Sequence, residues 1–436
     1  MRFTKLFAAV LCSLAALAAS GQNLRDEIAA NPGKSGGVYY VYTYDNPVLT
    51  PAPKGYKPFY ISHYGRHGSR WLLHDSEYDE VMAVFRAADA ANAFTERGRE
   101  VYGRVKRVYD DGIDRGGDLS PLGAEQHREI AARMYRNFPE VFRSGAVVDA
   151  QATLVVRCVL SMAAFCERLK ELNPRLEVSR TAGRRTTRYL NFYSKPTNPT
   201  LSREYLDFID KGGWQEEYER IGDRFVRPGR LMSELFADGE FVRTIDAQKL
   251  MKGLFYFAAD MQNVGLGISF YDLFTTDELY GLNVYDNYKY YVIRGPSPLN
   301  RRFPQYYAKA LLEDFLMRAD RAVEGGAVSA DLRFGHDGNL MTFVSLLQFE
   351  GCDVVESDPE KIAQMWPLYR ISPMAANIQL VFYRKKASDD VLVKFLYNER
   401  EVRIPVASDL APYYRWNDVR DFYRNVMENL PDPAGK

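Results

Sequence analysis

The chain has 436 residues, of which 46% are hydrophobic and 26% are charged. This composition is typical of a globular protein with two domains, or with one large domain that carries an insertion. Its 57 basic and 57 acidic residues cancel, which excludes a general attraction to nucleic acid or to an anionic membrane, so that any basic site must be local. The 30 Tyr and 25 Phe residues leave a glycan-binding function open.

The N-terminus has the pattern of an export signal. Arg2 and Lys5 provide the positive start, residues 6–17 form an apolar run, and Ala18-Ala19-Ser20 supplies the small residues of a cleavage site. The run is too short to span a membrane, and no later segment is long enough. We therefore expect residues 1–20 to be a signal peptide, and the mature protein to be periplasmic or secreted, with no membrane segment.

Cysteine usage argues against a disulfide scaffold and against a metal site. Beyond the signal region only Cys158, Cys166 and Cys352 remain, which allows at most one disulfide. Cys158 and Cys166 lie about 12 Å apart along one predicted helix, too far to bridge. No Cys or His pair has ligand spacing, and the acidic segment 110–118 lacks the glycine that a calcium loop needs at its sixth position. We expect no cysteine-based metal site, and predict a turn-rich connection at 110–118.

The elements of the first part of the chain follow from apolar periodicity and from helix start signals. Ser120 and Pro121 form a typical N-cap and first turn, and the helix after Arg157 ends before Pro174. The predicted elements are an irregular lead-in over 22–56, strands over 58–61 and 152–156, and helices over 76–90, 120–137 and 157–172.

Residues 175–290 differ from the rest of the chain: their pattern is helical, and they are rich in aromatic and charged residues. We expect them to form an inserted helical domain, with a capping box at Thr275-Thr276-Asp277-Glu278, and we place the α/β domain at 21–174 and 291–436. The predicted elements of the last part are helices over 308–322 and 339–349, and strands over 328–334, 378–384 and 391–397. The last two strands suit an antiparallel hairpin at an edge of the sheet.

The stretch Arg66-His67-Gly68-Ser69-Arg70 concentrates groups that bind anions. It follows an apolar run, and the chain has only five histidines, so His63 and His67 in one short stretch stand out. Two guanidinium groups beside an imidazole suit a phosphate, because arginine meets oxyanions with a planar fork of donors. Gly68 would let a ligand approach the backbone closely. A solvated basic turn is the alternative.

Two other segments repeat this placement. Arg157 stands where an apolar strand gives way to a helix, and His336-Asp337 follows the strand over 328–334. In open α/β sheets ligands bind at the carboxyl ends of the strands, where helix N-termini attract anions. The three segments could therefore meet at one anion site, although Arg157 could pair with a surface carboxylate and Asp337 could be a helix N-cap.

Together these segments resemble the histidine acid phosphatase family, branch 2 of the histidine phosphatase superfamily, which includes phytases and multiple inositol polyphosphate phosphatases. The resemblance covers about residues 57–405. Its motifs are Arg66-His67-Gly68-Ser69-Arg70, Leu119-Ser120-Pro121-Leu122-Gly123-Ala124-Glu125-Gln126, Arg157-Cys158-Val159-Leu160-Ser161-Met162-Ala163-Ala164-Phe165, His336-Asp337 and Pro373-Met374-Ala375-Ala376-Asn377-Ile378.

The resemblance implies an α/β fold of the phosphoglycerate-mutase type, a three-layer sandwich with a mostly parallel central sheet and an inserted helical domain. It also implies that His67 is the nucleophile, which forms a phosphohistidine, and that Asp337 is the general acid. Phosphate would be bound by Arg66, Arg70, Arg157 and His336, without a metal or cofactor. The substrate would be a small phosphomonoester, with phytate and other inositol polyphosphates as candidates.

Some features stay open at this stage. His63, Trp71, Arg184 and Arg185 are candidate substrate contacts, although such histidines are more often packed and such arginines more often solvated; His127 is expected at the surface. The residues after Trp71 do not continue as in typical phytases, and the pair His336-Asp337 matches the acid phosphatases and phytases rather than the inositol polyphosphate phosphatases, which usually carry His-Ala-Glu. The alternative function is that of a secreted, non-catalytic protein that binds phosphate esters or glycans.

Overall fold

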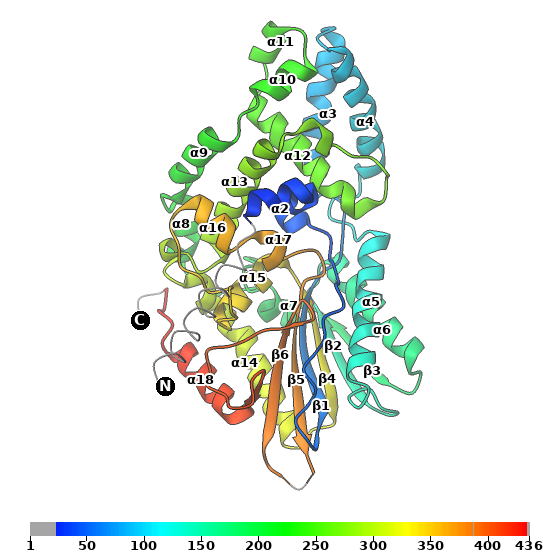
Figure 1. Cartoon of the computed structure of the whole chain (residues 1–436), viewed down its shortest axis with the longest axis vertical. Helices are drawn as coiled ribbons and strands as arrows, with labels where there is room; N and C mark the ends of the chain where they lie inside the picture. The colour runs from blue at the N-terminus through cyan, green and yellow to red at the C-terminus, as the bar shows by residue number, and fades with distance from the viewer. Residues whose placement is uncertain (1–22, 387, 434–436) are drawn as a thin grey trace, which may run out of the picture.

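The computed structural model describes residues 23–386 and 388–433, so the expected signal peptide lies outside the described residues. A twisted sheet stands between two layers of helices in the lower half of the molecule, and a helical block stands above the carboxyl ends of its parallel strands (Figure 1). The predicted α/β class, with a parallel central sheet and a large helical part, is confirmed.

The sheet runs in the order β3-β2-β4-β1-β5-β6-β7, and β8 pairs with β6. The strands β3, β2, β4 and β1 are mutually parallel, whereas β5 joins β1 in antiparallel fashion and continues into β6, β7 and β8. The strands are β1 (Tyr56–Arg66), β2 (Val147–Ala152), β3 (Glu177–Ala182), β4 (Val328–Gly335), β5 (Asn377–Lys385), β6 (Val391–Tyr397), β7 (Arg400–Glu401) and β8 (Tyr413–Arg415).

Helices cover both faces of the sheet, which is why β1, β4 and β5 are buried over most of their length. One face packs on α5 and α6, and the other on α7, α14, α15 and α18. These helices are α5 (Pro121–Asn137), α6 (Val156–Leu172), α7 (Arg184–Leu190), α14 (Phe303–Val323), α15 (Asp337–Leu346) and α18 (Trp416–Glu428).

The helical block and its junction with the sheet gather four separate parts of the chain: the lead-in, the segment after β1, the segment before α14 and the segment after α15. Helices α3 and α4 pack together, and α3 also packs on α12. The helices of the block and of its junction with the sheet are α2 (Leu24–Ala30), η1 (Pro32–Tyr39), α3 (Asp75–Ala90), α4 (Glu96–Gly112), α8 (Arg203–Lys211), α9 (Trp214–Phe225), α10 (Gly229–Leu235), α11 (Gly239–Arg243), α12 (Ala247–Val264), η2 (Tyr271–Leu273), α13 (Thr276–Arg294), η3 (Pro298–Asn300), α16 (Pro359–Met365) and α17 (Leu368–Ile371).

Several element boundaries differ from the expectations. β1 continues through His63 to Arg66, because it pairs with both β4 and β5. The strand expected over 152–156 lies over Val147–Ala152, so Arg157 belongs to the first turn of α6 rather than to the end of a strand. The lead-in contains α2 and η1, and residues 110–112 end the unpredicted helix α4. The segment 175–290 begins with β3, which pairs with β2 in the main sheet.

Other expectations hold. The Ser120 side chain accepts a hydrogen bond from the Gly123 amide at the start of α5, and Thr275 and Glu278 form the capping box of α13. β5 and β6 form the antiparallel pair. Cys158, Cys166 and Cys352 are all buried free thiols.

The described residues offer neither a membrane-spanning helix nor a cluster of metal ligands. None of the helices among them is long and apolar enough to cross a membrane. The same part of the chain contains no group of three His, Cys, Asp or Glu side chains placed to hold a metal ion.

Candidate active site

The loop Arg66–Arg70, here called the phosphate loop, is fixed where β1 ends. Arg66 pairs with Gly335 at the carboxyl ends of the parallel strands β1 and β4, so the histidines that follow, His67 and His336, lie side by side with their ring centroids 5.9 Å apart. The His67 amide donates to the Gly335 carbonyl at 3.0 Å, and the His67 carbonyl accepts from Ala375 at 3.0 Å. The sheet therefore brings the first and last motifs together.

The phosphate loop is also held from the side by α5 and α6. Gly68 lies so close to α5 that a Cβ atom there would stand 2.2 Å from the Gly123 carbonyl oxygen. The Gly68 amide donates to Ser161 Oγ at 3.1 Å, and the Ser69 amide donates to Gln126 Oε1 at 2.8 Å. Glycine is required at position 68 by this close packing of two backbones, more than by an approaching ligand.

The His67 ring is neutral and its Nε2 carries a free lone pair. Its Nδ1 lies 2.9 Å from the carbonyl oxygen of Gly68, which can only accept, so the proton belongs on Nδ1 and the lone pair on Nε2. The ring is buried, with 2% exposed surface. Burial lowers its pKa well below the ordinary value, and the positive charges of Arg157, Arg66 and Arg70 lower it further. The imidazole thus stays unprotonated, as a nucleophile must be, even in acid.

Arg66 is a fully buried guanidinium. Its Nη1 donates to the carbonyl oxygens of Val38 and Ser372, both at 2.7 Å, and its Nη2 lies 3.2 Å from Asp337 Oδ2. Burial lowers the pKa of Arg66 to about 10, so it remains charged at physiological pH. The two carbonyls fix the direction of the fork, while the Nε atom is left without a hydrogen-bond partner among the described residues.

Arg70 and Arg157 add two more cations. Arg70 Nη1 donates to the Trp71 carbonyl at 2.7 Å, and its guanidinium lies over the Tyr39 ring at 5.0 Å. Arg157 makes one long contact, 3.5 Å from Nη1 to the Gly117 carbonyl. The Nε atoms of both are buried and unpartnered in the part of the chain that the structure describes. Because an unpaired buried donor is costly, these arginines are suited to an oxyanion.

His336 and Asp337 begin α15 opposite the phosphate loop. His336 Nε2 lies 3.2 Å from Thr153 Oγ1, and burial lowers the His336 pKa to about 3, so it is a neutral donor. The Asp337 carboxyl is a quarter exposed. Burial raises its pKa, but Arg66 and Arg70 outweigh this and hold the pKa below the usual range. Without a ligand Asp337 is therefore a carboxylate.

The structure does not bring every predicted residue to this cluster. His63 is fully buried between Phe165 and Phe334, and His127, expected at the surface, is buried beside the same two rings. Both histidines are core residues because α5 packs face-on against the sheet. The remaining candidates are held elsewhere: Trp71 Nε1 donates to Asp111 Oδ2 at 2.8 Å, and Arg184 and Arg185 are exposed at the start of α7.

The structure adds residues that the sequence did not single out. Thr153 orients His336, and Ser161 binds the Gly68 amide. Asn263 reaches the phosphate loop from the helical block, where its Oδ1 accepts a hydrogen bond from Ser69 Oγ at 2.7 Å. Ser161 lies in a motif segment and could have been found there. Asn263 has no local signal, because its contact depends on how the helical block docks.

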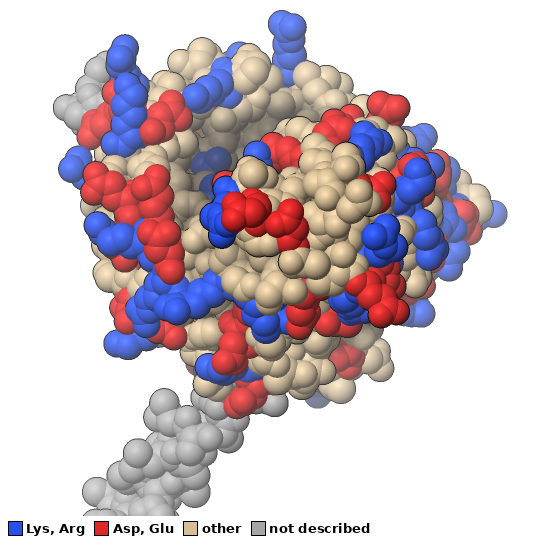
Figure 2. All heavy atoms as spheres, turned by 90° about the horizontal axis from the view of Figure 1, so that it is seen from above, with Lys and Arg blue, Asp and Glu red and all other residues tan. Residues whose placement is uncertain are grey.

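The molecule is hollowed on the side of the helical block. Seen from above, this face shows a depression with Lys and Arg atoms at its bottom, while basic and acidic side chains both stand around it (Figure 2). A cluster of cations below a hollow is the arrangement expected for a site that draws in anions.

Comparisons with known proteins agree with this geometry. The Bifidobacterium longum multiple inositol polyphosphate phosphatase, in complex with inositol hexasulfate, superimposes with a TM-score of 0.78 at 20% identity, over 89% of this chain and 97% of that one. The phytase from D. castellii gives a TM-score of 0.66 at 14% identity (91% and 85%), and the apo phytase from Hafnia alvei gives 0.53 at 12% (88% and 100%).

At these identities the likeness concerns the fold alone. Among curated protein sequences no significant match is found. The family pattern described as "Histidine phosphatase superfamily (branch 2)" matches residues 66–398, from the phosphate loop to the end of β6 and the turn after it. This span includes the phosphate loop, Arg157 and His336-Asp337, and the chain belongs to branch 2 of the histidine phosphatase superfamily.

Proposed function

We propose that the protein is an exported phosphatase that hydrolyses phosphomonoesters through a phosphohistidine on His67. The observation that carries the proposal is a neutral imidazole, with its lone pair on Nε2, surrounded by Arg66, Arg70 and Arg157. The transferring phosphoryl group is negative, so most of the catalysis consists of positioning and charge stabilisation. These three guanidinium groups and the His336 ring supply donors from several directions.

The reaction has two displacements. His67 Nε2 attacks phosphorus, the P–O bond to the leaving group breaks, and Asp337 gives its proton to the departing oxygen. Asp337 then accepts a proton from a water molecule, which attacks phosphorus and breaks the P–N bond. Inorganic phosphate leaves, His67 is neutral again, and Asp337 has regained its proton.

The first step needs a protonated Asp337, whereas Arg66 keeps the free carboxyl ionised. A bound phosphate group supplies the negative charge that keeps Asp337 protonated. Its negative oxygens attract the same guanidinium groups and repel the carboxylate, and both effects raise the carboxyl pKa in the complex. We therefore expect an acidic pH optimum, because the fraction of enzyme–substrate complexes with a protonated Asp337 falls as the pH rises.

The direct test is hydrolysis of p-nitrophenyl phosphate by the wild type and by His67→Ala. We expect the variant to lose turnover, and alkaline quenching of the wild type with labelled substrate to trap a phosphoprotein that is stable in base and labile in acid. His74→Ala, which changes an exposed histidine at the start of α3, serves as the matched control and should keep its activity. Turnover that survives in His67→Ala would refute the mechanism.

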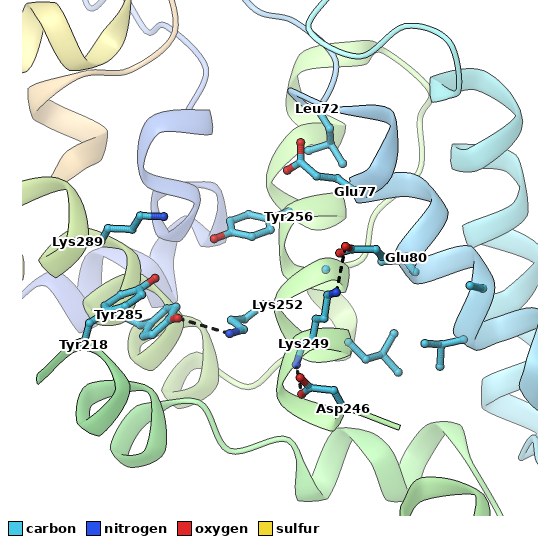
Figure 3. Close-up of a pocket in the computed structure, with 15 residues that line it drawn as sticks. Leu72, Glu77, Glu80, Tyr218, Asp246, Lys249, Lys252, Tyr256, Tyr285 and Lys289 are labelled. Atoms are coloured by element: carbon cyan, nitrogen blue, oxygen red, sulfur yellow. Dashed lines mark hydrogen bonds and ion pairs between the residues drawn. The ribbon is translucent and has the colours of Figure 1, made fainter. Parts of the chain in front are cut away.

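A cavity of about 550 Å³ supports a substrate with more than one phosphate. It lies between α3, α9, α12 and α13 (Figure 3). The ring of Tyr256, in the cavity wall, lies 6.0 Å from the ring of Tyr39, and the Arg70 guanidinium lies over the other ring, that of Tyr39. These two tyrosines therefore connect the cavity wall to the phosphate loop. Lys252 and Lys289 project into this cavity.

The cavity wall carries both lysines and carboxylates. Lys249 is paired with Glu80 at 3.0 Å, whereas Lys252 and Lys289 both face one carboxyl group, that of Asp286. The wall also carries Glu77 and Asp246, so its carboxylates are as numerous as its lysines. Lys252 and Lys289 are the cationic groups that would bind a second anionic group of the substrate. Inositol polyphosphates, phytate among them, meet this description. Values of kcat/KM for phytate, sugar monophosphates and nucleotides, in the wild type and in Lys252→Met/Lys289→Met, test it; equal losses for all three would refute the cavity's role.

The glycan-binding alternative loses its main support in the structure. Aromatic richness suggested stacking platforms, but large tyrosines such as Tyr60, Tyr64, Tyr78 and Tyr291 are at most 1% exposed and belong to the core. A non-catalytic phosphate-ester binder remains the outcome if p-nitrophenyl phosphate is bound but not cleaved. Export is tested by sequencing the N-terminus of the protein recovered from the periplasm or the medium, which we expect to begin after Ser20.

A further inference from the structure

Helix α12 sends two buried polar side chains, Asp260 and Asn263, to the back of the phosphate loop. Both have 0% exposed surface, and neither takes part in the proposed reaction. They lie almost two hundred residues after the loop in sequence, so the helical block, and not the sheet, provides them.

Asn263 links the loop to the lead-in. Its Oδ1 accepts a hydrogen bond from Ser69 Oγ at 2.7 Å, and its Nδ2 donates to the Tyr39 carbonyl at 2.9 Å. Gln126, on α5, donates to the same Ser69 Oγ at 2.9 Å. Ser69 stands between His67 and Arg70 in the chain, so any movement of this serine moves both the nucleophile and the clamp.

Asp260 provides a buried carboxyl group that interacts electrostatically with Arg70. Asn263 Nδ2 lies 3.4 Å from Asp260 Oδ1, and Asp260 Oδ2 has no hydrogen-bond partner among the residues that the structure describes. Burial raises the Asp260 pKa to about 8, while the positive charge of Arg70 opposes this rise. The titratable and charged groups that face it come from the loop after β1, α3, η1 and η2: Arg70, Glu77, Tyr78, Tyr39 and Tyr271.

We propose that Asp260 and Asn263 are positioning residues for the phosphate loop: Asn263 fixes the loop through Ser69, and Asp260 is a buried counter-charge that regulates how strongly Arg70 holds an oxyanion. The proposal rests on the proposed function in one respect, namely that Arg70 binds the phosphoryl group.

The sign of the effect follows from electrostatics. An ionised Asp260 attracts the Arg70 guanidinium and competes with a bound oxyanion, whereas a protonated Asp260 leaves the full positive charge to the ligand. Since the Asp260 pKa is about 8, oxyanion affinity should decrease as the pH rises through this value. By linkage, a bound oxyanion makes Asp260 harder to ionise by the same factor.

Sulfate is the probe for this coupling, because it stays fully ionised between pH 7 and 9 and is not turned over. We expect isothermal titration of the wild type to show sulfate affinity falling about fivefold or more across this range, the usual size of a coupling between two sites. In Asp260→Asn the affinity should not depend on pH and should match the tighter limit of the wild type. Asp260→Ser is a second charge-free variant.

A wild-type sulfate affinity that is flat from pH 7 to 9 would overturn the regulatory role of Asp260, as would parallel profiles for the wild type and the charge-free variants. Because sulfate binding needs no turnover, this result is separable from the proposed function. An inactive protein with pH-coupled sulfate binding would keep the inference and refute the phosphatase mechanism. An active enzyme with uncoupled binding would do the reverse.

Asn263 is tested against a matched asparagine of the same helical block. Asn287 is also fully buried; it donates to the Trp366 carbonyl at 3.1 Å and accepts from the Leu368 amide at 2.8 Å, and neither of these bonds is to the phosphate loop. We expect Asn263→Ala to lower kcat/KM about tenfold or more, since small displacements of catalytic groups are costly. Asn287→Ala should lose comparable stability but keep both kcat and KM. Equal kinetic losses in both variants would reduce Asn263 to a structural residue and overturn its positioning role.

Discussion

Replacing Gly68 with alanine is the sharpest test of how the catalytic loop is built. The added Cβ would lie 2.2 Å from the carbonyl oxygen of Gly123 and 2.6 Å from its Cα, where ordinary contacts begin at 3.4 Å. Both obstructing atoms are backbone atoms of α5 and cannot rotate away. The loop must therefore move from α5 by about 1 Å, which displaces the neighbouring residue His67, the proposed nucleophile.

The size of the effect follows from this displacement. Overpacking of a tight contact costs about 1–3 kcal/mol of folding stability. A shift of about 1 Å at reacting groups costs on the order of a hundredfold in rate, equivalent to about 2.7 kcal/mol of transition-state stabilisation. We expect Gly68→Ala to remain folded and to lose about a hundredfold in kcat for p-nitrophenyl phosphate.

The assay pairs steady-state kinetics with urea unfolding, and Gly103→Ala is the control. Gly103 lies inside α4, and a Cβ atom there would meet nothing within 4 Å. Because alanine favours helices, this control should gain about 0.5–1 kcal/mol with unchanged kcat. A Gly68→Ala enzyme with a kcat within about threefold of the wild type would show that the loop tolerates the shift and would refute the reasoning.

Three further predictions concern catalysis at Asp337, acid stability and a buried ion pair. Asp337→Asn should lower kcat by about a hundredfold or more for alkyl phosphates, whose leaving oxygen needs a proton, and much less for p-nitrophenyl phosphate; equal losses for both would refute the acid role. Burial lowers the His127 pKa to about 3, whereas the unfolded chain has about 6.5, so stability is full above the unfolded value and falls as the pH drops below it. Between pH 7 and 4.5, the free energy of unfolding in urea should therefore fall by about 1.4 kcal/mol more per pH unit in the wild type than in His127→Leu. Identical slopes for the two proteins would contradict this. Arg133→Met should lower the free energy of unfolding by about 3–5 kcal/mol, because Arg133 Nη2 binds the buried carboxylate of Glu399 at 2.8 Å. In the same assay Arg97→Met, which removes an exposed ion pair, should lower it by less than about 1 kcal/mol.

Local signals predicted much of the fold. The helix that starts at Pro121 and the one that starts at Thr276 were found because capping residues stand directly before them. The strand over 328–334 was found from its alternation. The strand over 152–156 was misplaced, because Leu154 and Val156 are apolar but exposed, at 49% and 64%, and an apolar run does not by itself show where burial ends.

The histidines show the limit of sequence reasoning most clearly. His63 and His127 are polar and lie near a catalytic motif, so a substrate contact and a surface position were reasonable expectations. Packing places both against Phe165 and Phe334 with almost no exposed surface. Whether an imidazole is a ligand contact or a core residue depends on what covers it, and that is a property of the assembled layers.

The sequence by itself determined the family and the chemical groups of the site, because the phosphate loop, Arg157 and His336-Asp337 each occupy short, contiguous segments with recognisable spacing. Tertiary structure alone decided which protonation states these groups have, since burial and the neighbouring guanidinium groups set the pKa values of His67 and Asp337. It also decided that α12 supports the loop through Asn263. The physical reason is that motif spacing depends on residues that are neighbours in the sequence. Burial, nearby charges and backbone contacts depend on segments that only folding brings together.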